Sequence, residues 1–268
     1  MCTKFESNHL PLLVIPGTLL TIACVTDCNF RSPLSGDDSG WRDLGEVDNQ
    51  LRQLAEGGQV SEILVLAGEV HPGSKLRSAW FEHCAAICRI ALSHSLLPHA
   101  NIGPLSAEEM KALAELNVSM GLMLEQSTTR LLETGMVHAA APSKRPELRR
   151  AQLVQAGELG VPFTTGLLLG IGETEADRLE TLNDIAELAV EFGHIGECIV
   201  QPYSVGESEA SLQKQTAAPL GYDLEQLPAF VATARATLPT DVAIQVPPVC
   251  FSQFSLSFCT SPCYRDRC

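Results

Sequence analysis

The sequence predicts an α/β fold, namely a partial (β/α) barrel of the TIM type, and three observations carry this prediction. Apolar runs of strand length alternate with segments of helical periodicity. No hairpin signal joins one strand to the next, so the strands are expected to be parallel and linked by crossover helices. Six or seven such units suit a barrel better than an open sheet built around one glycine-rich dinucleotide loop.

The first half of the chain supplies the clearest alternation. After a short strand ahead of Cys24, strands are predicted at 62–69, 98–103 and 118–125, with helices at 76–96 and 106–116 between them. Ser106 and Glu109 form a capping box, which fixes the start of the second helix.

The second half repeats the pattern. A helix at 146–160, closed by Gly160, precedes the stretch "VPFTTGLLLGIGET", which runs from a strand into a glycine turn. Thr174 then caps a helix that ends at Gly193. Further strands are predicted at 194–203 and 241–248, with a helix at 224–238 between them.

Composition excludes several classes of function. The net charge of -14 and pI near 4.9 argue against a nucleic-acid partner or an anionic membrane, because both need a basic surface. The opening run "LPLLVIPGTLLTIAC" has the length of a secretion signal, but Pro16 and Gly17 break it and Glu6 offsets Lys4. With 45% hydrophobic residues in 268, we expect a cytoplasmic protein with one large core and no membrane span.

The ten cysteines are informative through their positions. Cys24 and Cys28 directly follow the first predicted strand, where they can be metal ligands, the end of a secretion signal or buried thiols. Cys84 and Cys88 lie one helical turn apart among apolar residues and are expected to pack in the core. The tail at 249–268 holds four cysteines without the paired CxxC spacing of strong zinc sites, so we expect one domain at 1–248 followed by an atypical tail.

Polar residues and glycines follow most of the predicted strands. In a barrel the carboxyl ends of the strands form one shared pocket, which is where chemistry takes place. The residues at these ends include Gly68, Glu69, Asn101, Glu125, the segment 164–172, Gln201 and Tyr203. Each also has a structural explanation, because glycines turn the chain, glutamates cap following helices and an asparagine satisfies a loop carbonyl.

Three stretches resemble a known family: "SLLPHANIGPLSAEEMKALAELNVSMGLMLE", "ELGVPFTTGLLLGIGETEADRLETLNDIAEL" and "EFGHIGECIVQPY". Over roughly residues 24–248 the chain resembles the 7,8-didemethyl-8-hydroxy-5-deazariboflavin synthases, in particular their ring-closing, ammonia-releasing component. The resemblance implies a radical S-adenosylmethionine (radical SAM) lyase with a [4Fe-4S] cluster. It further implies a hydroxybenzyl ribityl-uracil adduct as substrate and the tyrosine-coupling synthase as a candidate partner.

The same resemblance gives Cys24 and Cys28 a role. Enzymes of this type carry CxxxCxxC after the first barrel strand, and "DCNFR" aligns with the end of that motif, so Cys28 matches the third ligand. Cys24 matches the first or the middle ligand, and one cysteine has no counterpart. Three thiolates leave one iron open for S-adenosylmethionine, whereas two would hold the cluster weakly.

The missing cysteine leaves three hypotheses. The chain is the ring-closing enzyme, or it is an impaired barrel that binds ligand without a stable cluster. A metal-free barrel lyase is the third, and the lack of a lysine at a predicted strand end counts against its Schiff-base form. Cys2 is the one upstream substitute, and nothing around it indicates such a role.

The resemblance also implies a set of cofactor-binding residues. Gly68 and Glu69 match the motif that receives the methionine amino group, and Glu125 matches the carboxylate that bonds the ribose hydroxyls. Arg149 is a candidate partner of the methionine carboxylate, although a solvated helix face is the simpler interpretation. Asn101, Gly170 and Ile171 complete the set, the last two backing the adenine. No general base is assigned, because His99, His138 and His194 can equally be structural.

Overall fold

The computed structural model describes residues 20–22, 41–58, 60–203 and 216–247. Its centre is one sheet of seven strands in sequence order, every neighbouring pair parallel. The strands are β1 (Leu20–Ile22), β2 (Glu62–Ala67), β3 (Leu97–Asn101), β4 (Ser119–Gly121), β5 (Phe163–Leu169), β6 (Ile195–Pro202) and β7 (Ala243–Gln245). The strand order runs from β1 to β7 without closing, so the described strands form the partial barrel that the sequence predicts.

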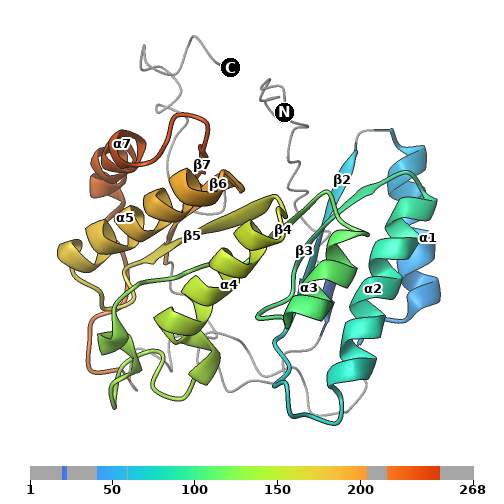
Figure 1. Cartoon of the computed structure of the whole chain (residues 1–268), viewed down its shortest axis with the longest axis horizontal. Coiled ribbons are helices and arrows are strands. Elements are labelled where there is room, and N and C mark those ends of the chain that lie inside the picture. The colour runs from blue at the N-terminus through green and yellow to red at the C-terminus, as the bar shows by residue number, and fades with distance from the viewer. Residues whose placement is uncertain (1–19, 23–40, 59, 204–215, 248–268) are drawn as a thin grey trace.

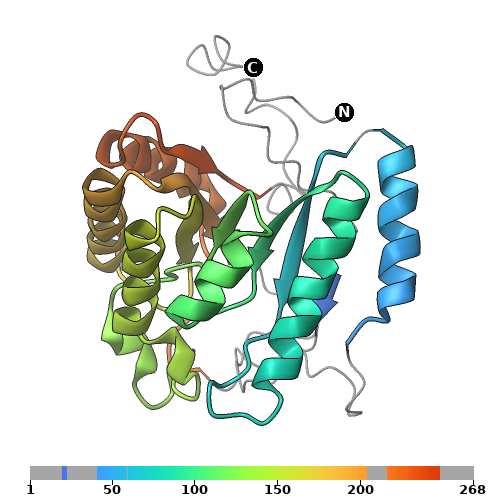
Figure 2. The same ribbon diagram turned by 45° about the vertical axis from the view of Figure 1, so that its right-hand side comes forward.

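Helices follow the strands along the chain and cover one face of the curved sheet (Figures 1 and 2). They are α1 (Leu44–Glu56), α2 (Arg77–Ser93), α3 (Ala107–Ala114), α4 (Pro146–Glu158), α5 (Glu175–Phe192) and α7 (Leu227–Thr237). Three short 3₁₀ helices, η1 (Thr129–Leu132), η2 (Pro142–Lys144) and η4 (Leu224–Gln226), lie between them. No helix in the described ranges has both the length and the apolar content needed to cross a bilayer.

Local capping sets the helix boundaries as predicted. The Ser106 hydroxyl accepts the Glu109 N–H, and the Glu109 carboxylate accepts the Ser106 N–H, which completes the capping box of α3. Thr174 and Asp177 form a second box at α5, which ends at Gly193 in the left-handed conformation, with a φ of 66°. Helix α1 was not predicted, although Asp43 caps it and its buried Val47 and Leu51 have helical spacing.

The predicted strand at 118–125 is shorter than expected. Its ladder stops at Gly121 and resumes only as a bridge between Glu125 and Leu167. In the interval the Thr165 hydroxyl accepts the Leu124 N–H and donates to the Leu122 carbonyl. A side chain thus replaces one rung of backbone pairing, and the chain reaches Glu125 in an irregular path.

The core lies between the sheet and its helices. Alternate strand residues such as Ile63, Val65 and Leu167 point toward the helices and are buried, together with Trp80 from α2. Cys84, Cys88 and Cys198 are buried in the same core, which confirms their predicted packing as apolar groups.

The opposite face of the sheet is the concave interior of the barrel. Leu64, Leu66, Leu168 and Ile199 alternate with the core residues, are half-buried and do not belong to the core between sheet and helices. The strand register brings the carboxyl ends together at one edge, where Ile22 is paired with Ala67 and Leu66 with Asn101. Residues after these ends therefore share one site.

Candidate functional site

Four charged residues gather at the carboxyl ends of the strands: Glu69, Glu125, Lys144 and Arg149, called here the mouth of the barrel. Arg149 Nη2 lies 2.5 Å from Glu69 Oε1, and Lys144 Nζ lies 2.5 Å from Glu125 Oε1. The glutamates follow β2 and β4, whereas Lys144 ends η2 and Arg149 belongs to α4. The acids therefore come from strand ends, and the cations come from the segment that follows them.

Arg149 is the central member of the mouth and is only 1% exposed. Its Nε donates to the Ser143 carbonyl at 3.1 Å, and its Nη1 donates to the Met123 carbonyl at 2.6 Å. The interpretation of Arg149 as part of a solvated helix face is therefore wrong, because the side chain points inward and joins η2 to the ends of β2 and β4. Its predicted contact with a methionine carboxylate stays a prediction and requires one of these bonds to be exchanged.

Glu125 is a buried carboxylate in an unusual backbone conformation. It is 8% exposed, and its φ of 67° lies in the left-handed region that side chains rarely adopt. Such strain is common at functional sites. Burial opposes ionisation, but the charges of Lys144 and Arg149 outweigh it and hold the pKa of Glu125 at about 2. Glu125 is thus an ionised acceptor, which suits two neighbouring hydroxyl donors.

One of the two oxygens of Glu69 is an acceptor without a hydrogen bond. Its Oε2 is buried and has no partner at hydrogen-bond distance within the described part of the chain, although the Ser143 side chain lies near the carboxylate. Burial opposes ionisation, but the nearby charges of Arg149 and Lys144 and the Ser143 side chain lower the pKa of Glu69. An unsatisfied, ionised carboxylate oxygen costs free energy unless a donor arrives, and an ammonium group is the donor that suits it. The described mouth therefore fits the amino group of S-adenosylmethionine.

The glycine at 103 allows Glu69 to take this position. Gly103 has a φ of 97°, and a Cβ there would lie 2.4 Å from Glu69 Cγ, closer than atoms can approach. Gly68 is buried directly before Glu69, and Asn101 ends β3 half-buried beside them. The structure thus brings Gly68, Glu69, Asn101, Glu125 and Arg149 to the same edge of the sheet.

The loop after β5 is held by its own glutamate. Glu173 accepts the N–H groups of Gly170 and Ile171, both at 2.7 Å, and the Nε of Arg178 at 2.6 Å. Gly221 lies so close to Gly170 that a Cβ on Gly170 would be 2.4 Å from the carbonyl carbon of Gly221. Both loop amides are therefore already bonded, and the predicted backing of an adenine can use the surface of this loop but not those donors.

Cys24 and Cys28 lie outside the described residues, as does the tail from 248 onward. The described ranges hold no group of three or more His, Cys, Asp or Glu that could bind a metal ion. Burial raises the pKa of Cys84, of Cys88 to about 11 and of Cys198 to about 12, so thiolates are disfavoured at all three. None of these three cysteines fits the missing cluster ligand.

The three histidines have different surroundings. His194 packs against the rings of Phe163 and Phe192, with centroid distances of 6.3 and 5.7 Å, and is structural. His138 is buried near Glu125, and burial lowers its pKa to about 4 despite the attraction of that carboxylate. His99 lies inside the barrel, and burial lowers its pKa to about 4 as well.

Two residues of the site were missed from the sequence. No lysine directly follows a predicted strand, but Lys144 at the end of η2 reaches Glu125 and so brings an amine to the strand ends. Glu173 belongs to the quoted "GIGET" stretch, but nothing local shows that its carboxylate turns back onto the loop amides. Lys144 contacts a residue 19 positions away in the sequence, and Glu173 contacts near neighbours through the fold of its loop. Neither contact can be read from a linear pattern.

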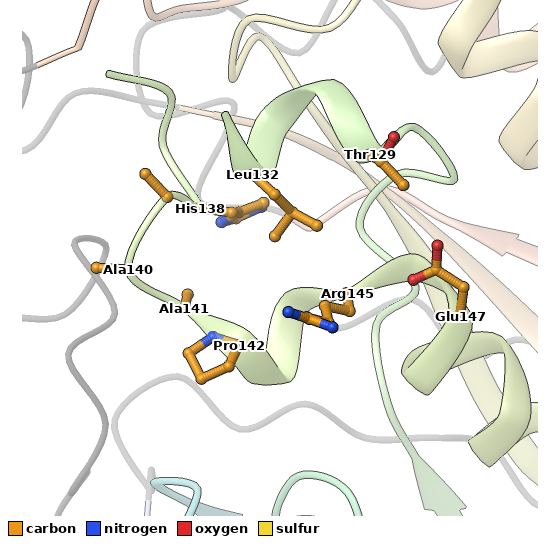
Figure 3. Close-up of a pocket in the computed structure, with 9 residues that line it drawn as sticks. Thr129, Leu132, His138, Ala140, Ala141, Pro142, Arg145 and Glu147 are labelled. Carbon is orange, nitrogen blue, oxygen red and sulfur yellow. The ribbon is translucent and has the colours of Figure 1, made fainter. Parts of the chain in front are cut away.

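A pocket of about 390 Å³ opens beside the mouth (Figure 3). In the figure Thr129, Leu132 and His138 lie on one side of it, and Pro142, Arg145 and Glu147 lie on the other. It is formed by the connection between β4 and α4, the segment that also supplies Lys144. The connection therefore supplies Lys144 to the mouth and lines most of the pocket next to it.

Comparisons with known proteins show the family to which the chain belongs. Residues 19–185 match the family described as the Radical SAM superfamily. The chain is 50% identical over 242 residues to a 7,8-didemethyl-8-hydroxy-5-deazariboflavin synthase of Trichormus variabilis, an alignment that covers 90% of this chain and 68% of that protein. It is 52% identical over 221 residues to a protein of the same name from Gloeobacter violaceus, with coverage of 82% and 66%. The chain thus spans about two thirds of the length of these relatives.

Solved structures show the same architecture. HydG, a maturase of the FeFe-hydrogenase, is similar with a TM-score of 0.64 at 16% identity, covering 84% of this chain and 50% of the HydG chain. Methylornithine synthase (PylB) is similar with a TM-score of 0.58 at 13% identity, covering 88% and 74%. At these identities the likeness shows the fold alone, and it confirms the partial barrel.

Proposed function

Because the chain belongs to the radical SAM superfamily and, within it, to the 7,8-didemethyl-8-hydroxy-5-deazariboflavin synthases, we propose that it closes the deazaflavin ring of a hydroxybenzyl ribityl-uracil adduct and releases ammonia. The observation that carries the proposal is the mouth, where two ionised carboxylates and two cations meet at the strand ends. The barrel is assigned to residues 1–248 and the tail to 249–268. The tyrosine-coupling synthase is the proposed partner.

The cofactors of the superfamily are a [4Fe-4S] cluster and S-adenosylmethionine. When bound, they supply a 5′-deoxyadenosyl radical that abstracts hydrogen from the substrate. Cys24 and Cys28 would hold the cluster. Glu69 would accept the methionine ammonium through its unsatisfied Oε2, and Glu125 would accept the ribose hydroxyls.

The other residues of the mouth keep these acceptors in place and charged. Arg149 fixes Glu69 by a direct bond and anchors itself to two backbone carbonyls, so the carboxylate loses little freedom when a ligand arrives. Lys144 holds Glu125 ionised. The half-buried leucines of the concave face leave few exchangeable hydrogens near a reactive intermediate, which protects the reaction from water and stray donors.

Cluster binding is tested by iron and sulfide analysis after anaerobic reconstitution. We expect Cys28→Ser to lose most of the bound iron, whereas the matched control Cys84→Ser keeps it, because Cys84 is buried in the helix-side core. Release of 5′-deoxyadenosine by the unmodified chain would support the activity. Equal iron in the Cys28→Ser variant and the parent would contradict the assigned ligand.

A second candidate function is favoured by the cysteine positions. The motif around Cys24 and Cys28 supplies two cysteines, and the described residues provide no metal-binding group in place of the third. A barrel impaired in this way would still bind S-adenosylmethionine at Glu69 and Glu125. Calorimetric binding of S-adenosylmethionine to a chain that takes up no iron identifies this case. Binding together with full iron uptake excludes it.

A further inference from the structure

A second group of polar side chains lies at the other end of the barrel interior. Glu62, His99, Ser119, Thr164 and Glu197, called here the floor cluster, come from five successive strands, β2 to β6. Each lies near the amino end of its strand, and none belongs to the apolar core under the helices. The floor cluster is therefore separate from the mouth, which stands at the carboxyl ends.

The members of the floor cluster are in contact. His99 Nδ1 lies 2.7 Å from Ser119 Oγ, and the Thr164 hydroxyl donates to Glu197 Oε2 at 3.4 Å. Gly121 joins the two pairs, because it is in register with Thr164, and a Cβ on it would lie 2.9 Å from His99 Nε2. The polar groups therefore form one continuous surface across the concave face.

One carboxyl oxygen of the cluster has no hydrogen-bond partner among the described residues. Glu62 is 4% exposed, yet its Oε1 receives no hydrogen bond in the part of the chain that the structure describes. Burial and the charge of Glu197 raise its pKa to about 7, and burial raises the pKa of Glu197 to about 7. Buried polar atoms are normally satisfied, so an empty acceptor here indicates a place for a hydroxyl or amide donor.

The surface between the mouth and the floor cluster is apolar. Leu64, Leu66 and Ile199 are half-buried on this face, and Gly121 and Gly166 add no side chain to it. Along the regular strand β5, three residue steps lead from Thr164 in the floor cluster to Leu167, which bridges Glu125 of the mouth, and this corresponds to about 10 Å. A ligand of that length with an apolar middle and a hydroxylated end matches this sequence of surfaces.

We propose that the floor cluster binds the polyhydroxylated side chain of the substrate, with Glu62, Thr164 and Glu197 as its hydrogen-bonding partners. This assignment rests on the proposed function, because a deazariboflavin precursor carries a ribityl chain with several hydroxyl groups. Carboxyl groups without a neighbouring cation, hydroxyl groups and an imidazole suit an uncharged polyol, since each can exchange hydrogen bonds with it. The ring system then lies against the apolar middle of the barrel, next to the mouth.

The test uses two flavins that differ only in whether they carry a ribityl side chain. Riboflavin carries a ribityl group, and lumiflavin has the same ring system with a methyl group in its place. Equilibrium binding to the full chain is measured by flavin fluorescence, and we expect riboflavin to bind about tenfold more tightly than lumiflavin. Thr164→Val and Glu62→Met should each remove most of this preference and leave lumiflavin binding unchanged, whereas Glu158→Gln on the exposed end of α4 keeps it.

Equal affinity of the parent chain for the two flavins would overturn the proposal without any variant. A preference that survives both Thr164→Val and Glu62→Met, in protein whose fold is verified by circular dichroism, would overturn it as well. Binding of S-adenosylmethionine is measured on the same samples. If S-adenosylmethionine binds and riboflavin is not preferred, the floor assignment fails and the proposed function stands. If riboflavin is preferred and S-adenosylmethionine does not bind, the proposed function fails and the floor cluster still binds a polyol.

Discussion

The two ends of the barrel interior place glutamates in opposite electrostatic surroundings. At the mouth, Glu125 is buried beside Lys144 and Arg149, and its pKa is about 2. At the floor, Glu197 is half-buried, but its loss of solvation is not offset by a cation, and its pKa is about 7. The same side chain is thus a permanent anion at one end and largely protonated at mildly acidic pH at the other.

The difference arises from the connections, not from the strands. Both cations of the mouth follow β4, in η2 and α4, and reach over the carboxyl ends of the sheet. Within the described ranges no ion pair joins Glu62 or Glu197 to a basic side chain. One end of the barrel is therefore charged through the segment that follows a single strand, while the opposite end carries polar groups without a paired cation.

The largest effect is expected when the mouth loses its central cation. Arg149→Met removes the ion pair of Glu69 and leaves the Ser143 and Met123 carbonyls without this donor, so the free energy of unfolding should fall by about 3–5 kcal/mol. Urea unfolding at pH 7 measures the loss. The matched control is Arg89→Met, which breaks an exposed ion pair with Glu82 at 3.7 Å and should cost less than about 0.5 kcal/mol. Equal losses in the two variants would remove the distinction between mouth and surface.

A smaller effect is expected from the floor and shows as a change in pH dependence. The pKa of Glu197 is raised from 4.5 in the unfolded chain to about 7, so its contribution to stability is present below pH 4.5 and is lost as pH rises through 7. This shift corresponds to about 3 kcal/mol, of which water in the open concave face will screen a part.

The Glu197→Gln variant tests that slope. Glutamine keeps the size of the side chain and cannot ionise, so the variant should gain free energy of unfolding over the parent between pH 5 and pH 8. Glu62 still titrates in this variant, so part of the slope remains. Chemical unfolding of the metal-free protein at several pH values gives the comparison, with Glu158→Gln as control. Parallel profiles for parent and Glu197→Gln would show that the floor glutamate is not buried as the structure has it.

The smallest effect on stability is expected from a substitution at Gly121, which lies on the concave face between the mouth and the floor cluster. In Gly121→Ala the added Cβ would lie 2.9 Å from His99 Nε2 and 3.2 Å from the Thr164 carbonyl, which should cost about 1 kcal/mol. Gly196→Ala is the matched control, because nothing lies within 4 Å of a Cβ at that position. Thermal unfolding of both variants measures the difference, and a Gly121→Ala variant as stable as Gly196→Ala would mean that His99 does not rest on this strand.

Most of the fold could be predicted from the sequence because it is written in local patterns. Apolar runs and helical periodicity identified all seven strands and all α-helices after β2, and capping residues such as Ser106 and Thr174 fixed the starts of two of these helices. The shortened ladder of β4 was not predictable in this way. It depends on the hydroxyl of Thr165, which lies 41 residues further along the chain than the Leu124 N–H it accepts.

The candidate site divides along the same line. The acids Glu69 and Glu125 follow predicted strands, so their meeting at one edge followed from the parallel barrel alone. Arg149 was named through a resemblance, but its burial, its bond to Glu69 and the presence of Lys144 at Glu125 required the coordinates. Long side chains on loops and helices can turn inward or outward, and spacing in the sequence does not tell which.

The sequence by itself determined the parallel barrel, the order of its elements and the edge at which the polar strand ends gather. Those features depend on short-range periodicity and on a fixed handedness of connection, which every segment carries within itself. The tertiary structure alone decided which glutamates are ionised. Ionisation depends on burial and on the distance to cations contributed by distant segments, and both exist only once the chain has folded.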